Sequence, residues 1–301
     1  MTSKLFIISR NGTRREPTAT ELEEISGGVM KTLLMHKFNP KILAIMVVLA
    51  GKRMLNRTYN ERHMLTETAL DMHHIEIECN EKTLTLPFGG DLWFPLFTQI
   101  FIKSEYCLEE SDIRGKTIID AGANIGAFSL YCACMGAKKV HAFEPVKETY
   151  EGLLRNIRAN NLQGTITAYN YGLGEKAKTA MIKCDYAGDA GASMETRKHQ
   201  RKNEQQVEIT SIDLLQLEPD VIKIDTEGYE ENILNGATKT IREYGPILTL
   251  SAYHKLTDRE SLPRKIKEID GRYECIMNRR YEEVLTCRRR AEPLRREKPI
   301  R

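Results

Sequence analysis

A strand, a glycine-rich turn and a helix follow one another between residues 116 and 137, and this run constrains the fold more than any other part of the chain. Residues 116–120 read KTIID, an apolar, β-branched run that predicts a buried strand. The turn AGANIG follows at 121–126, and residues 127–137 are predicted to be helical. Glycines in such a turn adopt dihedral angles that other residues avoid. The order predicts one unit of an α/β sheet.

The same alternation continues over the rest of the chain. Further strands are predicted at 139–145, 165–172, 179–184, 206–212, 221–225 and 247–253, and helices at 148–161, 230–244 and 259–269. Two last strand-like runs, 273–278 and 281–288, follow one another closely. Strands that alternate with helices predict a doubly wound α/β sheet, and the closing pair predicts an antiparallel hairpin at its edge.

The first third of the chain is less regular, and the division into parts reflects this. We divide the chain into a helical N-terminal region, a catalytic domain and a basic tail, at 1–84, 85–287 and 288–301. Within the N-terminal region we expect helices at 20–37 and 41–56. The runs HHIEIEC and KTLTLPF, at 73–79 and 82–88, indicate a pair of strands.

One apolar run in the N-terminal region bears on membrane binding. ILAIMVVLA occupies residues 42–50, and a membrane-spanning helix needs about 20 apolar residues, so this run is too short to cross a bilayer. It is either a buried helix or a helix on an anionic membrane surface, because residues 31–62 carry seven Lys or Arg against one Glu. Residues 1–17 have an apolar patch of only four residues and do not read as a secretory signal.

Charge and cysteine content indicate partners and compartment. The net charge is +3, but residues 288–301 hold seven basic and two acidic residues. The tail's +5 leaves −2 for residues 1–287, which disfavours a nucleic-acid partner for the body. The cysteines contain no CxxC pair and are expected to be free thiols in the cytoplasm, with peripheral membrane association as the alternative. There are seven of them, Cys79, Cys107, Cys132, Cys134, Cys184, Cys275 and Cys287.

The carboxyl ends of the first two strands of the sheet carry a nucleoside-binding pattern. In open α/β sheets, ligands bind at these ends where the strand order switches. Four candidate cofactor-binding residues lie at the end of the first strand and in the loop after it, Asp120, Gly122, Asn124 and Gly126. Glu144 follows 18 residues after Gly126, where an acidic side chain accepts hydrogen bonds from both ribose hydroxyls.

The spacing of the glycines narrows the choice of nucleoside. A dinucleotide fold would show GxGxxG, and a P-loop would show GK[ST] after its second glycine. Here the glycines are spaced GxxxG behind an acid, and Ala-Phe follows. An acidic first position with a short glycine turn suits a cationic, phosphate-free ligand. We therefore predict S-adenosylmethionine as the cofactor.

Five segments of the chain match the pattern of a known family. They are IIDAGANIGAFSLY, KKVHAFEP, LLRNIRANN, TSIDLL and VIKIDTEGYEENILNGA. Together they resemble the FkbM family of S-adenosylmethionine-dependent methyltransferases, over about residues 100–285. The resemblance implies a class I methyltransferase (Rossmann-like) fold, with a seven-stranded, mostly parallel sheet whose last strand is antiparallel. It also implies that Asn124 is usual in this family where other methyltransferases have glycine.

Charged residues at two further strand ends are candidates for the reaction. A central parallel strand is buried on both faces, yet VIKID at 221–225 places Lys223 and Asp225 on one side, and both are catalytic candidates. We predict that Asp225 or its neighbour Glu227 acts on the acceptor hydroxyl, as general base or as ligand of a divalent cation. His254, at the end of the next strand, is a second candidate. Alternatively, Lys223 pairs with Asp225 or Glu227 and only fixes the turn.

The acceptor is the least constrained part of the prediction. The family resemblance implies O-methylation of a hydroxyl on a sugar, glycolipid or other small metabolite. The stretch 120–160 is also similar to transfer-RNA guanine methyltransferases, although no NPPY-like segment follows VIKID to stack a base. A third reading is a non-catalytic scaffold that retains the fold and binds an anionic membrane through residues 31–62 and the tail.

Overall fold

The computed structural model describes several ranges of the chain and centres on the predicted sheet. These ranges are 5–9, 14–15, 72–79, 82–87, 100, 106–184, 203–279 and 283–290. Side chains are described at 83–85, 100, 106–182, 204–279 and 283–290. The helices expected at 20–37 and 41–56, including the apolar run at 42–50, lie outside the described residues.

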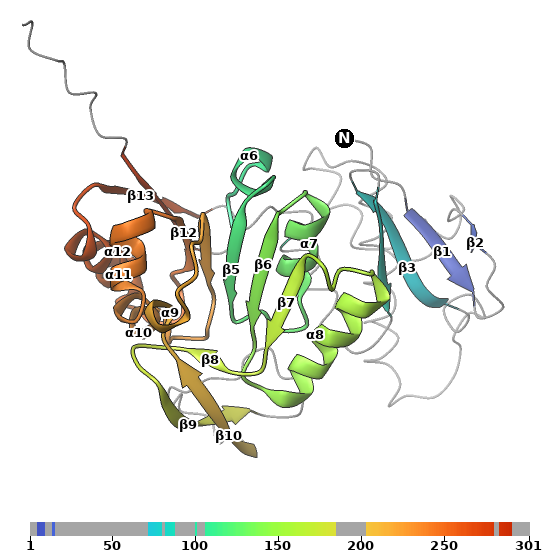
Figure 1. Cartoon of the computed structure of the whole chain (residues 1–301), viewed down its shortest axis with the longest axis horizontal. Coiled ribbons are helices and arrows are strands. Elements are labelled where there is room, and N and C mark those ends of the chain that lie inside the picture. The colour runs from blue at the N-terminus through green and yellow to red at the C-terminus, as the bar shows by residue number, and fades with distance from the viewer. Residues whose placement is uncertain are drawn as a thin grey trace, which may run out of the picture.

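Seven strands form the main sheet, in the order β13-β14-β12-β11-β5-β6-β7 (Figure 1). They are β5 (Thr117–Ala121), β6 (Lys139–Phe143), β7 (Ile166–Tyr169), β11 (Val221–Ile224), β12 (Ile247–Ser251), β13 (Tyr273–Asn278) and β14 (Val284–Arg289). The five strands from β12 to β7 are parallel, and β14 is antiparallel to both β12 and β13. The doubly wound sheet and its antiparallel edge hairpin are confirmed.

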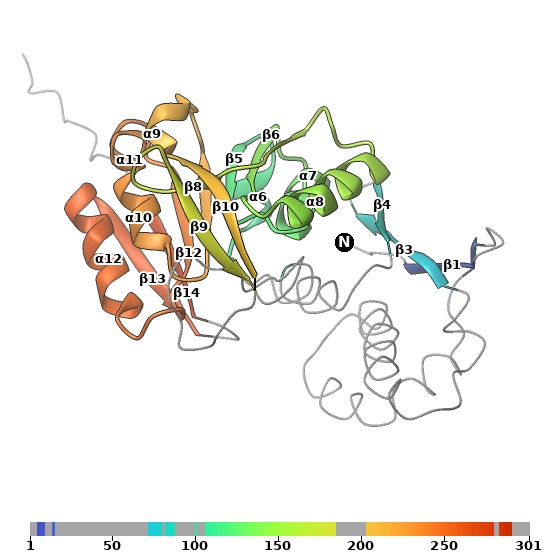
Figure 2. The same cartoon turned by 90° about the horizontal axis from the view of Figure 1, so that it is seen from below.

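Helices cover the two faces of the sheet because its central strands are apolar on both sides. The helices are α6 (Glu110–Ile113), α7 (Ala127–Cys134), α8 (Lys147–Ala159), α9 (Ile212–Leu215), α10 (Glu230–Asn235), α11 (Thr238–Tyr244) and α12 (Asp258–Ile269). Ile118 of β5 packs in one core cluster with Leu130 of α7 and Leu153 of α8. Its neighbour Ile119 points to the opposite face and packs in the cluster formed with α10, α11 and α12. Figures 1 and 2 show the two helical layers on either side of the sheet.

A separate three-stranded sheet lies beside the carboxyl end of the parallel strands (Figure 1). It consists of β8 (Gly172–Leu173), β9 (Lys178–Cys184) and β10 (Asn203–Thr210). Both longer strands were expected from the sequence, which did not assign them to a sheet. Gly174 shows how close the small sheet lies to the loop after β11, because a Cβ there would be 3.0 Å from the ring of Tyr229. The small sheet therefore forms one wall beside the loops that carry the candidate site residues.

The described part of the N-terminal region is a four-stranded antiparallel sheet. Its strands are β1 (Leu5–Ser9), β2 (Arg14–Arg15), β3 (Met72–Cys79) and β4 (Lys82–Pro87), in the order β2-β1-β3-β4. The pairing of β3 with β4 confirms the predicted strand pair. The strands β1 and β2 were not expected in a region predicted to be helical, because β1 finds its partner β3 more than 60 residues away. The β4 strand is tied to the catalytic domain by Asn160, whose side-chain amide donates to the Thr85 carbonyl over 2.9 Å.

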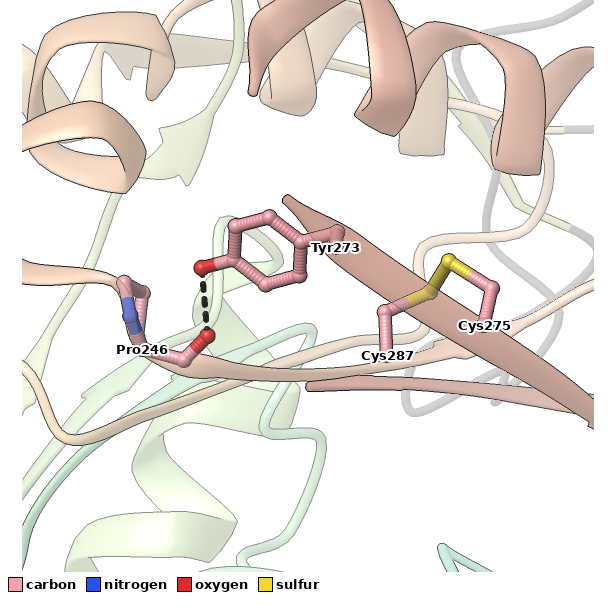
Figure 3. The surroundings of a disulfide bond; sticks show 4 residues. All are labelled: Pro246, Tyr273, Cys275 and Cys287. Atoms are coloured by element: carbon pink, nitrogen blue, oxygen red, sulfur yellow. Dashed lines mark hydrogen bonds between the residues drawn. A yellow bond between two sulfur atoms is a disulfide. The ribbon is translucent and has the colours of Figure 1, made fainter. Parts of the chain in front are cut away.

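Cys275 and Cys287 form a disulfide, which corrects the expectation that all cysteines are free thiols (Figure 3). The two residues lie 12 positions apart and face each other across the β13–β14 pair. Sequence spacing alone does not reveal this register. Among the described residues, Cys107, Cys132 and Cys134 remain thiols. Because disulfides are rare in reducing compartments, the cysteines no longer favour the cytoplasm.

The basic tail begins inside the sheet rather than beyond it. Arg288 and Arg289 belong to β14, and Arg290 follows directly. Each pairs with an acid: Arg288 with Asp112, Arg289 with Asp270 and Arg290 with Glu274. Part of the tail's positive charge is thus neutralised by the catalytic domain, while residues 291–301 lie outside the described part. Among the described residues, no helix is long and apolar enough to cross a membrane.

Candidate active site

The loop after β5 is held close to the loop after β11, and this requires glycine. Gly122 has a φ of 75°, and a Cβ there would lie 2.0 Å from the backbone oxygen of Asp225. Gly126 has a φ of 93°, and a Cβ there would lie 2.4 Å from the side chain of Leu153. Asn124 also adopts a left-handed conformation, which asparagine tolerates better than most residues. The glycine spacing therefore reflects how tightly this loop packs against Asp225 and Leu153.

Glu144 joins this loop to the end of β6. One carboxylate oxygen accepts a hydrogen bond from the Asn124 amide over 2.9 Å, and the other accepts one from the Val146 amide over 2.9 Å. Burial raises the pKa of Glu144 to about 7, although both amides act in the opposite direction. Each carboxylate oxygen has a second lone pair, so Glu144 retains capacity for ligand hydroxyls.

Asp120 lies beneath the loop and is bound by protein groups on both oxygens. Its Oδ1 accepts from the Lys223 ammonium over 3.0 Å and its Oδ2 from the Ser129 hydroxyl over 2.6 Å. Asp120 is 0% exposed and Lys223 3% exposed. Lys223 also donates to the Gly122 carbonyl over 2.8 Å. This buried ion pair therefore supports the loop from below.

The partner of Lys223 differs from the pairs considered from the sequence. Asp225 and Glu227 were the expected partners, but Asp120 stands directly opposite Lys223 in the parallel register of β5 and β11. Burial opposes the positive charge of Lys223, but Asp120 and Asp225 raise its pKa above the usual value. Lys223 thus stays charged and is kept back from the surface of the site.

Asp225 is the carboxylate that reaches solvent at the end of β11. Its side chain is 24% exposed. The Tyr106 hydroxyl donates to its Oδ2 over 2.8 Å, and the His254 Nε2 lies 3.6 Å from its Oδ1. Burial raises the pKa of Asp225, but Lys223, His254 and the hydrogen bond from Tyr106 outweigh it and lower the pKa. Asp225 is therefore ionised and oriented.

His254 lies among three carboxylates rather than at the surface. Its Nδ1 is 2.9 Å from the Oε1 of Glu230, and its Nε2 is 3.8 Å from the Oε1 of Glu227. The side chains of His254 and Glu230 are each 1% exposed. Burial lowers the pKa of His254, but Glu230, Asp225 and Glu227 together raise it to about 9. The imidazole is therefore protonated at neutral pH.

Comparison with known families gives the family of this chain. The family described as the methyltransferase FkbM domain matches residues 120–274, just over half of the chain. This chain belongs to the FkbM methyltransferase family. The match begins at Asp120 and includes Glu144, Asp225 and His254. The family resemblance and the class I methyltransferase fold expected from the sequence are thus confirmed.

Individual relatives of this FkbM chain are distant. It is 25% identical over 188 residues to "Hexuronic acid methyltransferase AglP" from Haloferax volcanii, which covers 60% of this chain and 72% of that protein. It is 35% identical over 86 residues to "Methyltransferase sdnD" from Sordaria araneosa, covering 28% and 32%. The crystal structure of methyltransferase FkbM from Methylobacillus flagellatus KT is 24% identical, with a TM-score of 0.47, covering 64% and 47%. The chain thus spans less than half the length of the last two proteins.

The FkbM chain also has a group of side chains with the composition of a metal site. Asp225, Glu230 and His254 offer ligand atoms within 4.8 Å of one another. A histidine ligand must be neutral to bind a metal. Here the His254 Nδ1 lies against Glu230, and the surrounding carboxylates hold the imidazole in its protonated form. The imidazolium itself supplies the positive charge between these acids, so the residues do not favour the divalent cation considered from the sequence.

Two residues of the FkbM site were assigned no catalytic role from the sequence. Glu230 was read only as the start of a helix, and Tyr106 lies more than 100 residues before Asp225. The signal for Glu230 is its position two residues after Gly228, where an acid at a helix start can accept from loop amides. For Tyr106, no sequence pattern indicates the contact with Asp225, which forms only in the folded chain.

Proposed function

We propose that this FkbM methyltransferase transfers a methyl group from S-adenosylmethionine to a hydroxyl oxygen of a sugar or another small metabolite. The family and its fold imply S-adenosylmethionine as the methyl donor. The observation that carries the proposal is the ionised, partly exposed Asp225, whose backbone lies against the Gly122 loop. A carboxylate there stands beside the loop that would hold the donor. The name of the relative AglP, a hexuronic acid methyltransferase, supports a sugar derivative as the acceptor.

Several residues around the loop would hold the cofactor, each in a different way. Glu144 would accept hydrogen bonds from the ribose hydroxyls with the lone pairs that its two amide donors leave. Gly122, Asn124 and Gly126 would shape the loop that faces the ligand. Asp120 would act through Lys223, which holds the Gly122 carbonyl. When bound, S-adenosylmethionine supplies an electrophilic methyl group on a sulfonium.

Asp225 would take up the proton that the acceptor loses. The acceptor hydroxyl would pass its proton to Oδ1 of Asp225 as its oxygen accepts the methyl group. S-adenosylmethionine would supply that methyl group and leave as a neutral thioether. An oxygen that is being alkylated becomes strongly acidic, so a carboxylate with a lowered pKa is basic enough to receive its proton. Lys223 and His254 keep Asp225 ionised before the reaction. Positioning supplies much of the remaining rate enhancement.

No specific observation favours either alternative function. RNA methylation was considered because the tail is basic, but the first three arginines of the tail are paired with Asp112, Asp270 and Glu274. The membrane scaffold was considered because of the basic residues at 31–62, and these lie outside the described part of the chain. A glycolipid remains within the proposed class of acceptors, because its head group offers the same sugar hydroxyls.

A labelled-methyl assay tests the acceptor class. We expect transfer from methyl-labelled S-adenosylmethionine to hexuronic acid glycosides, and we expect the label to survive mild alkali, because a methyl ether is stable where a methyl ester is hydrolysed. Matched neutral hexosides, which lack the carboxylate of the hexuronic acid, serve as controls. Release of the label by alkali would place the methyl group on a carboxyl oxygen and would overturn hydroxyl methylation.

A pH titration of cofactor-product binding tests the role of Glu144. Ligand hydroxyls favour the ionised carboxylate, so binding of S-adenosylhomocysteine should release a proton from a group whose pKa is about 7. By calorimetry, affinity should be constant above that pH and fall by roughly tenfold per pH unit below it. Glu144→Gln should bind roughly 10–100-fold more weakly and without this pH dependence. Glu148→Gln, at an exposed position on α8, is the control; a Glu144 variant with wild-type affinity contradicts the assignment.

A further inference from the structure

Glu230 gathers an unusual number of donors on one oxygen. Its Oε1 accepts from the Thr226 amide over 3.0 Å, from the Thr226 hydroxyl over 3.3 Å and from the Gly228 amide over 3.1 Å. The same atom lies 2.9 Å from the Nδ1 of His254. Glu230 begins α10, so these contacts tie the loop after β11 to a helix and to the end of β12.

Charged groups surround His254 on every element that packs against it. Asp225 comes from the end of β11, Glu227 from the loop and Glu230 from α10. Asp258, the first residue of α12, is buried and interacts electrostatically with both Glu230 and His254. Asp225, in turn, faces Lys223 and the hydroxyl of Tyr106. His254 thus lies among these four acids, while Lys223 acts on Asp225 and Lys255 acts on Asp258.

We propose that Glu230 is a positioning residue for the methyl transfer, which holds His254 as an imidazolium beside Asp225 and fixes the loop that carries Asp225 and Glu227. The inference rests on the proposed function, in which Asp225 receives the acceptor's proton. A proton on Nδ1 that points to Glu230 leaves Nε2 turned toward Asp225 and Glu227. The imidazolium then stabilises the ionised form of Asp225, and Glu230 acts on the reaction only through His254 and the loop.

The backbone of the loop supports the same conclusion. Glu227 has a φ of 56°, a left-handed conformation that is unfavourable for glutamate, and Gly228 follows with a φ of 104°. The hydrogen bonds from Thr226 and Gly228 to Glu230 bracket this strained residue. One buried carboxylate therefore sets both the shape of the loop and the charge of its neighbouring imidazole.

Glu230→Gln separates these two effects, because an amide oxygen still accepts from the loop but carries no charge. We expect the pKa of the His254 imidazole, followed by NMR, to fall by about 1–2 units. Because His254 must keep its proton to stabilise the ionised Asp225, we expect the alkaline limb of the kcat/KM profile to move to lower pH. Above the lowered His254 pKa, kcat should fall roughly tenfold. The Kd for S-adenosylhomocysteine should stay unchanged. Glu231→Gln, its exposed neighbour on the same helix, is the control and should behave as the wild type.

Several outcomes would overturn the proposal. They are a Glu230→Gln protein with an unshifted His254 titration, or one with lower thermal stability and an unchanged pH profile. If the variant does not fold, His254→Gln removes the positive charge of the imidazole itself and tests the same interaction. The wild-type protein also gives a direct test, because a His254 pKa near its ordinary value refutes the proposal. Absence of methyl transfer by the wild type would refute the proposed function instead, while the NMR titration would still decide the role of Glu230.

Discussion

Asp225→Asn is expected to lower kcat at least about 100-fold while leaving the affinity for S-adenosylhomocysteine unchanged. The amide keeps the size of the side chain and can still accept the Tyr106 hydrogen bond, but it cannot take up a proton. Asp225 lies at the partly exposed end of β11, whereas Glu144 and the Gly122 loop would bind the cofactor. The variant should therefore lose turnover without losing affinity for S-adenosylhomocysteine. Steady-state kinetics with a methyl-accepting glycoside and calorimetry with the cofactor product measure turnover and affinity.

Asp220→Asn is the matched control for Asp225→Asn. Asp220 stands just before the amino end of β11, where it accepts hydrogen bonds from the Lys116 side chain and the Thr117 amide. The same chemical change is thus made at the opposite end of the same strand, and turnover should stay within about twofold. If Asp225→Asn kept normal turnover but lost thermal stability, the carboxylate would be a structural partner of Lys223 and His254, and the proposed base would be wrong.

Lys223→Met is expected to lower the free energy of unfolding by about 3–5 kcal/mol, the largest stability effect at the site. The substitution fills the space of the alkyl chain but leaves Asp120 buried with only the Ser129 hydrogen bond. It also removes the donor to the Gly122 carbonyl, so the loop loses a contact. Urea unfolding followed by circular dichroism measures the change.

The double variant Asp120→Asn, Lys223→Met shows whether the ion pair is the cause. Removing the unpaired charge should make the double variant more stable than Lys223→Met alone, by roughly 1–3 kcal/mol. A Lys223→Met protein within about 1 kcal/mol of the wild type would show that Asp120 finds another partner or takes up a proton. Turnover lost without any loss of stability would return Lys223 to the catalytic role considered from the sequence.

Most of the catalytic domain was predictable because its signals are local. The run 116–126 combines a buried strand with a glycine turn, and the structure places both as expected. The small sheet shows the limit of such signals. The strands β9 and β10 were recognised as strands, but their apolar positions do not show whether they join the main sheet. That choice depends on which partners the connecting segments allow.

The candidate site shows the same division between local pattern and long-range contact. Glu144, Asp225 and His254 were predicted as site residues because each ends a predicted strand, and parallel strands bring such ends together. The pairing of Lys223 with Asp120 was missed because it depends on the register between β11 and β5. The disulfide was missed for the same reason, since Cys275 and Cys287 meet only through the register of β13 and β14.

By itself, the sequence indicated the family through its resemblance. It also determined most strands and helices after residue 116 and the strand ends where chemistry can occur, because these follow from spacing and polarity within short segments. Only the tertiary structure showed which side chains lie close enough to set the charge state of one another. It placed Lys223 beneath the loop, Tyr106 against Asp225 and His254 beside Glu230. Burial and neighbouring charges set a pKa, and neither can be read from residues far apart in the chain until the fold brings them within a few ångströms of one another.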